Sequence, residues 1–201
     1  MTVYSPFYKD FPSRCLSLLN KYYDHAQMNN MEVTLMVSIA SSGFVIPFER
    51  INHEIYKKKK THPYSEYLDI VDKSFVSEFS DNKGLNSDWS ISVNVTPRWD
   101  NINGWKGIRP YSKMEEKYTV SEILCVLRNA LAHGSIFVEG DKDNIINNMF
   151  FVATPQKSGK GKYWAVIVSP KDFRIFLDKW FNFISKLDFK FEEVKEDIEE
   201  P

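Results

Sequence analysis

Hydrophobic residues recur at the three- and four-residue spacing of one helix face through most of the chain. In the first 80 residues this spacing predicts four amphipathic helices that bury one side in a shared core. They are expected at 12–27, at 31–42, from Phe48 to about Tyr56, and at 65–79. Gly43 and Pro47 are expected to interrupt or kink the second helix before the third begins. The residues that the fourth helix is expected to turn inward are Leu68, Val71, Phe75 and Phe79.

A two-residue alternation replaces this spacing in the middle of the chain. In WSISVNV (89–95) every second residue is apolar, which predicts a strand with one buried face. Three further short strands are expected near 135–139, 148–154 and 163–168, with polar loops between them. Residues 97–110 hold two prolines, two glycines and two tryptophans, and this composition favours a packed irregular loop.

Two more helices carry clear start signals. Thr119, with Glu122 three residues later, predicts a capping box and a helix over about 120–132 that ends before Gly134. Ser169-Pro170 predicts the start of the last helix, because proline is favoured at the first helical position. The apolar stripe of this helix is expected to comprise Phe173, Phe176, Leu177, Trp180, Phe183, Ile184 and Leu187.

These elements predict a mainly α fold, a helical bundle with a small antiparallel β appendage. The chain has 201 residues, of which 43% are hydrophobic and 15% aromatic, and this suits one well-filled domain, expected over 1–187. Residues 188–201 hold seven acidic and two basic residues and are expected to form a loose acidic tail. No run approaches the roughly 20 apolar residues of a membrane span, and the N-terminus lacks the pattern of a secretory signal.

Cysteine content and charge narrow the class of function. Cys15 and Cys125 both lie in apolar helical patterns, which fits buried thiols in a reducing cytoplasm better than a disulfide scaffold. The formal net charge of −1 gives no global positive field, which argues against a high-affinity nucleic-acid coating protein. Any contact with RNA must therefore rest on local cationic groups. The run KKKK is either a solvated helix end or a salt-sensitive guide for an RNA backbone; its residues are Lys57, Lys58, Lys59 and Lys60.

The end of the helix over 120–132 is unusually polar. Asn129 and His133 are four residues apart, so they stand on one face, a turn apart. Arg128 lies about 100° around the helix from Asn129, but its long side chain can bring the guanidinium to the same edge. The apolar stripe occupies a different sector, so the three polar groups are expected to gather beside the last turn.

Arginine, asparagine and histidine are sufficient to cleave RNA without a metal or another cofactor. A histidine, with a reference pKa of about 6.5, can exchange a proton near neutral pH, and an arginine grips phosphate through two parallel hydrogen bonds. A base removes the proton of a 2′-hydroxyl, which attacks the adjacent phosphorus while cationic donors hold the developing charge. A structural role is the alternative, because histidine complements the dipole at a helix C-terminus and arginine can cap the last carbonyls.

The octapeptide LRNALAHG (127–134) resembles the R-x4-H signature of HEPN domains, in the form where a polar residue follows the arginine. The segment EVTLMVSIASSGFVIPFERI (32–51) and the strand-rich stretch after the motif resemble a plasmid-associated bacterial branch of this family. The resemblance is patchy over 12–187 and sharpest at 121–140. It implies an all-α bundle with the motif at the end of a late helix.

The resemblance also implies a function. Active HEPN proteins are metal-independent endoribonucleases of toxin–antitoxin and antiphage systems, and they act as dimers whose two motifs face one cleft. By this analogy Arg128, Asn129 and His133 are the catalytic set of an RNA-cleaving homodimer, and an antitoxin protein is an expected partner. Proton transfer is assigned to His133 and phosphate binding to Arg128. The alternative is a non-catalytic HEPN module that binds a nucleotide, RNA or a partner protein.

Other motifs do not predict a competing site. HEIYK (53–57) lacks the second histidine of a zinc-protease helix, and the cysteines are not paired at metal-ligand spacing, so no metal site is expected. KSGKGKYW (157–164) lacks the residue order of a phosphate-binding loop and runs into a strand. Trp99 and Trp105 could stack on bases, but their proline and glycine neighbours favour a packing role.

Overall fold

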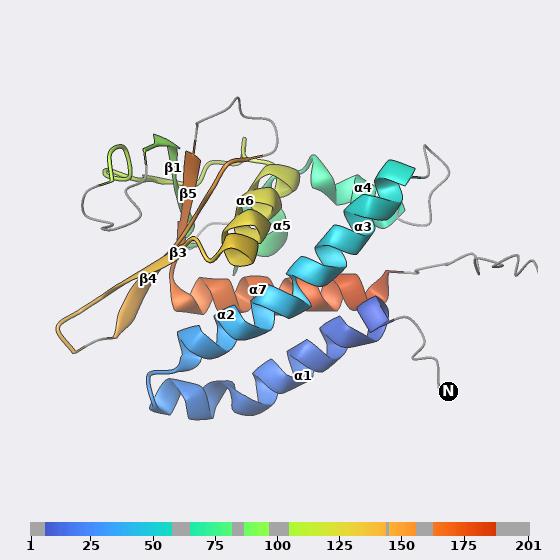
Figure 1. Cartoon of the computed structure of the whole chain (residues 1–201), viewed down its shortest axis with the longest axis horizontal. Helices are drawn as coiled ribbons and strands as arrows, with labels where there is room; N and C mark the ends of the chain where they lie inside the picture. Colours follow the sequence, from blue (N-terminus) through green and yellow to red (C-terminus); the bar gives the residue numbers. More distant parts are fainter. Residues whose placement is uncertain are drawn as a thin grey trace, which may run out of the picture.

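The computed structural model describes residues 7–57, 65–81, 87–96, 105–143, 145–155 and 163–187. Within these ranges the chain forms seven helices and one five-stranded antiparallel sheet (Figure 1). The helices are α1 (Phe7–Met28), α2 (Glu32–Gly43), α3 (Val45–Lys57), α4 (Ser65–Val71), α5 (Phe75–Phe79), α6 (Val120–His133) and α7 (Pro170–Lys186). The strands are β1 (Ser90–Val95), β2 (Ser112–Lys113), β3 (Ile136–Gly140), β4 (Ile146–Ala153) and β5 (Tyr163–Val168). The predicted acidic tail, 188–201, lies outside the described residues, and the division into a domain of 1–187 and this tail stays a prediction.

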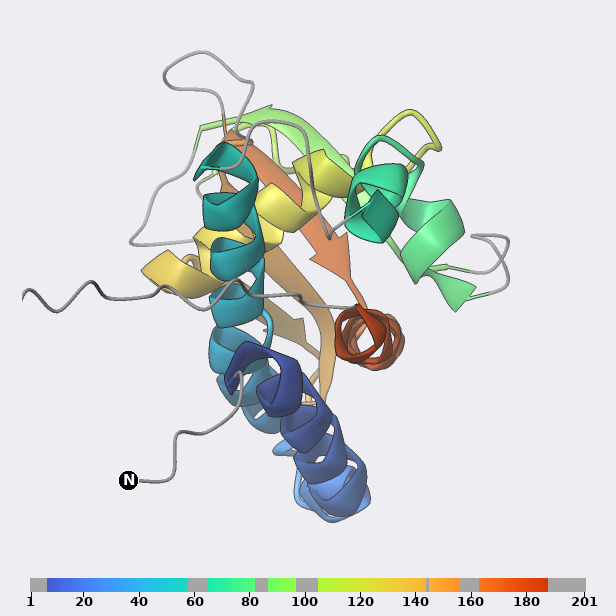
Figure 2. The same cartoon turned by 90° about the vertical axis from the view of Figure 1, so that its right-hand side faces the viewer.

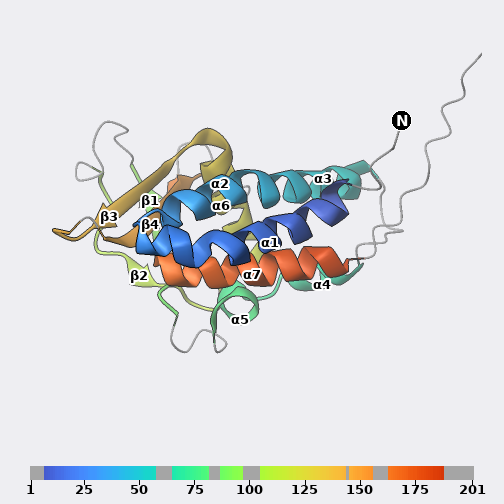
Figure 3. The same ribbon diagram turned by 90° about the horizontal axis from the view of Figure 1, so that it is seen from below.

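The long helices lie beside one another and carry most of the core. α1, α7 and the pair α2–α3 run lengthwise together (Figures 1 and 3). Figure 2, which looks along α7, shows α6 crossing between α2–α3 and the sheet. Six of the seven residues in the predicted stripe of α7 are buried, and Phe183 is partly buried against the same core. The stripe prediction is therefore confirmed.

The predicted interruption at Gly43 and Pro47 is slight, because α2 continues almost directly into α3. The Phe48 N–H bonds to the carbonyl of Phe44 at 3.1 Å, so helical hydrogen bonding resumes at once. Pro47 is tolerated in the first turn of α3, where a backbone N–H has no partner within the helix. Among the described residues, one stretch, Glu32–Asn52, is long and apolar enough to cross a membrane, a test that core helices of soluble proteins also pass. Of its most apolar window, 44% is buried inside the fold.

The single helix predicted over 65–79 is wrong, because the chain forms two short helices there, α4 and α5. Between them the chain turns, and the Phe75 N–H bonds to the carbonyl of Tyr118 at 2.9 Å. This contact with the segment before α6 replaces the hydrogen bonds that one long helix would make. The turn also changes which side of α4 faces inward, so Leu68 is 44% exposed while Tyr67 is 2% exposed.

The β element is a wall of the core and larger than the small appendage that the sequence predicts. Its strand order is β2-β1-β5-β4-β3, and every neighbouring pair is antiparallel. On the face covered by helices, Met149 and Phe151 of β4 join the main core. Phe150 and Val152 point the other way, into a second apolar cluster that includes Trp105. The fold is thus mainly helical, with a five-stranded sheet that is buried on both faces along β4.

The loop before β2 packs against the second cluster, as the composition of 97–110 predicts for its described part. Trp105 is buried, and its ring centroid lies 4.4 Å from that of Phe137. Trp99 lies outside the described residues. The alternation predicted for β1 fails at one place, because Asn94 adopts a φ of 59° where the pairing with β5 shifts register, and Val93 becomes exposed.

Candidate active site

Helix α6 carries the candidate site at its C-terminal end. Thr119 and Glu122 form the predicted capping box, in which the Thr119 hydroxyl accepts from the Glu122 N–H and the Glu122 carboxylate accepts from the Thr119 N–H. One face of the helix is buried against β4 and the neighbouring helices. The residues that anchor it include Ile123, Leu124, Leu127 and Leu131. This anchoring leaves the polar last turns at the molecular surface.

Gly134 ends α6 in the left-handed conformation, with φ 68° and ψ 21°. Its N–H bonds to the carbonyl of Ala130, and the Ser135 N–H bonds to the same carbonyl at 2.9 Å. The chain then reverses, and β3 begins at Ile136. His133 is consequently the last residue of the helix and stands next to the edge strand of the sheet.

Replacing Gly134 with alanine is expected to destabilise the protein by about 1–2 kcal/mol. A Cβ atom at this position would meet nothing within 4 Å, so the cost arises from the positive φ and not from a clash. Asparagine tolerates this conformation better, so Gly134→Asn should cost less than Gly134→Ala in urea unfolding. Equal stability of the alanine variant and the wild type would contradict the role of Gly134.

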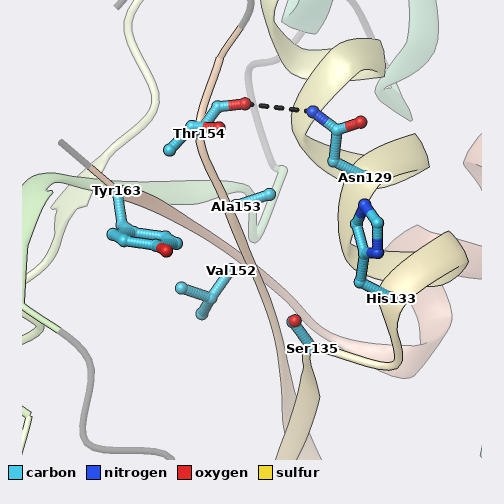
Figure 4. A pocket seen from close by; sticks show the side chains of 7 residues that line it. All are labelled: Asn129, His133, Ser135, Val152, Ala153, Thr154 and Tyr163. Carbon is cyan, nitrogen blue, oxygen red and sulfur yellow. Dashed lines mark hydrogen bonds between the residues drawn. The ribbon is translucent and has the colours of Figure 1, made fainter. Parts of the chain in front are cut away.

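Asn129 links the helix to the sheet through its side-chain amide. Its Nδ2 donates to the backbone carbonyl of Thr154, just beyond β4, at 3.1 Å (Figure 4) and approaches the Cys125 Sγ at 3.6 Å. Its Oδ1 accepts a hydrogen bond from the Arg128 Nη1 at 2.5 Å. Both polar ends of the amide are therefore used within the protein, and one of them orients the guanidinium.

Arg128 also meets an acidic partner on α3. Its Nε lies 2.5 Å from the Oε1 of Glu49, although the N–H is not aligned for a hydrogen bond. The two side chains are 29% and 46% exposed, so water screens the ion pair and its contribution to stability is small. The guanidinium is thus oriented by Asn129 and Glu49, and the Arg128 side chain remains partly exposed.

An open pocket of about 370 Å³ lies beside the last turns of α6 (Figure 4). Asn129 and His133 form one side, Tyr163 lies opposite, and β4 residues lie between them. The His133 side chain is exposed, and the described part of the chain gives its imidazole no hydrogen-bond partner. Arg128 does not line the pocket and reaches it only through Asn129. The full lining is Asn129, His133, Ser135, Val152, Ala153, Thr154 and Tyr163.

The other candidate residues from the sequence are possible metal ligands, the run of four lysines and the two cysteines. In the described ranges, no three His, Cys, Asp or Glu side chains gather closely enough to hold a metal ion. The four lysines proposed to contact RNA are not positioned, because only the backbone of Lys57 is described, at the end of α3, and 58–60 lie outside the described residues. Cys15 and Cys125 are both buried and neither forms a disulfide within the described residues, which agrees with the prediction of buried thiols.

Sequence reasoning missed six residues that shape the site, namely Glu49, Ser135, Val152, Ala153, Thr154 and Tyr163. Ser135 directly follows the motif and could have been included on that ground. Glu49 lies in the FERI segment, where nothing local distinguishes it from a solvated acid. Thr154 contributes its backbone carbonyl, which leaves no trace in the residue type, and Tyr163 reaches the pocket only through the order of the strands.

Comparison with known proteins identifies the family. A family model described as HEPN pEK499 p136 matches residues 1–191 of the chain. No curated protein and no solved structure shows significant similarity to the chain. The matched range, 1–191, spans both the helical layer and the sheet. The chain therefore belongs to the HEPN pEK499 p136 family of HEPN domains.

Proposed function

We propose that this protein is a metal-independent endoribonuclease whose reactive groups lie at the C-terminal end of α6. Membership of the HEPN family supports a nuclease or a nucleotide-binding module. The observation that carries the proposal is the exposed imidazole of His133, which lines a pocket together with Asn129, the residue that accepts a hydrogen bond from the Arg128 guanidinium. We further propose that α1, α2, α6 and α7, which share the main core, form the HEPN bundle.

The proposed reaction is a transesterification within the RNA. His133 removes the proton of a 2′-hydroxyl, and the oxygen attacks the adjacent phosphorus to form a 2′,3′-cyclic phosphate. The bond to the 5′-oxygen breaks, and that oxygen takes a proton from an acid. Arg128 binds the phosphate and stabilises the negative charge that develops on its oxygens. Asn129 acts as a positioning residue, because its amide is already bonded to Arg128 and to the carbonyl of Thr154.

A homodimer would complete this site. One subunit supplies a single histidine, whereas two α6 ends that face each other supply a base and an acid. Two Arg128 side chains brought together would repel one another and favour an anionic phosphodiester between them. The exposed position of His133 is compatible with such a shared cleft. In a bacterium the enzyme would act in the cytoplasm as a toxin or antiphage effector, restrained by an antitoxin protein.

The direct test is incubation of the purified protein with end-labelled single-stranded RNA in EDTA. We expect cleavage to persist in the chelator and to leave 2′,3′-cyclic phosphate ends on the 5′ fragments. Cleavage that appears only after Mg²⁺ is added would contradict the proposal, because it would require a site elsewhere in the chain. Light scattering on the same sample tests the dimer.

A non-catalytic module that binds a nucleotide, RNA or a partner protein is the second candidate function. It is favoured by the position of Arg128, which contacts Glu49 and does not line the pocket next to His133. Under this alternative the protein binds RNA or mononucleotides in EDTA, and none of several unstructured RNAs is cleaved over hours. Turnover of any of them by the wild type, lost in His133→Ala, excludes this alternative.

A further inference from the structure

The pocket beside α6 has an aromatic wall that the proposed reaction does not use. Tyr163 is the first residue of β5, is partly buried, and lies across the pocket from His133 (Figure 4). It belongs to the sheet, whereas the reactive groups belong to a helix. A side chain from a separate layer is not needed for proton transfer or for phosphate binding, so its role is a different one.

We propose that this pocket receives an unpaired nucleobase next to the scissile phosphate, with the Tyr163 ring stacking on the base. The inference rests on the proposed function, because it assigns the substrate contact of the same site. A volume of about 370 Å³ falls at the small end of the ligand-pocket range of roughly 300–1,000 Å³, which suits one nucleotide unit. The site therefore takes single-stranded RNA and excludes a base that remains paired in a duplex.

The chemistry of the pocket walls matches a flat ring with polar edges. Val152 and Ala153, which are almost fully buried, line the pocket between the two sides, and Tyr163 offers an aromatic ring. Polar groups lie around them, namely the Ser135 hydroxyl and the Asn129 amide, whose Nδ2 and Oδ1 are also bonded to Thr154 and Arg128. A nucleobase presents the same division, with apolar faces for stacking and donors and acceptors along its edge.

The position of Tyr163 is fixed by the sheet. Tyr163 pairs with Val95 of β1 and packs against the second apolar cluster. The opposite side of the pocket is fixed as well, because Asn129 is bonded to the Thr154 carbonyl that follows β4. A base held between these two sides would keep its ribose at the rim, beside the exposed imidazole of His133. By binding one nucleobase, the pocket thus selects which 2′-hydroxyl lies next to His133, the proposed proton acceptor.

The test measures kcat and KM of Tyr163→Ala and Tyr163→Phe on short single-stranded RNAs in EDTA. Loss of one stacking contact is expected to raise KM by roughly 5- to 150-fold, whereas Tyr163→Phe retains the ring and should stay within about threefold of the wild type. Tyr22→Ala, which removes an exposed tyrosine on α1, is the matched control and should change neither constant. If Tyr163→Ala does not fold by circular dichroism, Tyr163→Leu removes the ring and keeps an apolar side chain.

An RNA with one abasic nucleotide at the cleavage position separates stacking from a general loss of binding. The KM of the wild type on this RNA should rise as much as the KM of Tyr163→Ala rises on the intact RNA. The KM of Tyr163→Ala should be the same on the abasic and the intact RNA. An unchanged KM in Tyr163→Ala, with the wild type active, overturns the inference and leaves the proposed function intact. If the wild type cleaves no RNA, the proposed function fails. Titration with AMP and UMP, followed by NMR, then tests whether the pocket binds a nucleobase. Binding that Tyr163→Ala abolishes supports the base site, and no binding of either nucleotide overturns it.

Discussion

Replacing His133 with alanine is expected to reduce RNA cleavage by about 10²–10⁴-fold, the usual contribution of a general acid or base. The side chain is exposed and makes no hydrogen bond within the described residues, so its removal should leave the fold unchanged. Single-turnover cleavage of labelled RNA, with a thermal melt of each variant, separates a chemical loss from a loss of stability. A comparable loss in Arg128→Ala is expected, because the phosphate then lacks its cationic partner.

His25 provides the matched control for this experiment. It is an exposed histidine in the last turn of α1, so His25→Ala makes the same chemical change in a similar helical setting. We expect it to retain wild-type cleavage. Cleavage that survives both His133→Ala and Arg128→Ala would remove the end of α6 from the mechanism. Arg128→Lys tests whether the charge alone is sufficient. Lysine keeps the positive charge but lacks the planar guanidinium that can bind phosphate and the Asn129 amide at the same time.

The largest effect on stability is expected from Phe176→Ala, at about 3–5 kcal/mol. Phe176 is fully buried in α7, and its ring contacts aromatic rings from α2–α3, α5, α7 and the start of β1. Its aromatic neighbours are Phe44, Phe75, Phe79, Trp89, Phe173 and Trp180. Removing the ring leaves a cavity at the point where these elements meet, and each neighbour loses contacts that rigid packing cannot restore.

Urea unfolding followed by tryptophan fluorescence measures this effect. Domains of this kind have a free energy of unfolding of about 5–15 kcal/mol, so the variant should show a much lower midpoint or be unfolded at room temperature. Leu18→Ala is the control, because Leu18 is an exposed apolar residue on α1, and the change should stay within about 0.5 kcal/mol. A loss below about 1 kcal/mol in Phe176→Ala would show that the core does not depend on this ring.

Two of the helices that the sequence predicts, α6 and α7, carry their own start signals. α6 begins at the capping box of Thr119, and α7 begins after Ser169, whose side chain accepts a hydrogen bond from the N–H of Asp172. The sequence predicts one helix where the structure has α4 and α5, because the signal that separates them is tertiary. The chain turns where Phe75 bonds to Tyr118, and hydrophobic spacing over 65–79 contains no information about that distant partner.

The same distinction applies to the candidate site. The placement of Asn129 and His133 along one side of α6, with Arg128 bonded to Asn129, follows from the geometry of a single helix, which the spacing of residues determines. Glu49 and Tyr163 come close to them only because α3 crosses α6 and because β5 lies between β1 and β4. Strand order depends on pairing between distant segments, and so the pocket itself could not be derived from local patterns.

The bond from Asn129 to the carbonyl of Thr154 has a mechanical consequence for the side chains of Arg128 and His133, to which we assign the reaction. Helix termini usually fray, because their last backbone groups lack partners within the helix. Here the final turns of α6 are fastened to the strand layer from the side and run into β3 through a two-residue turn. The thermal motion of the Arg128 guanidinium and the His133 imidazole is therefore limited by the rigidity of the hydrogen-bonded sheet. A helix terminus without this bond would be more mobile.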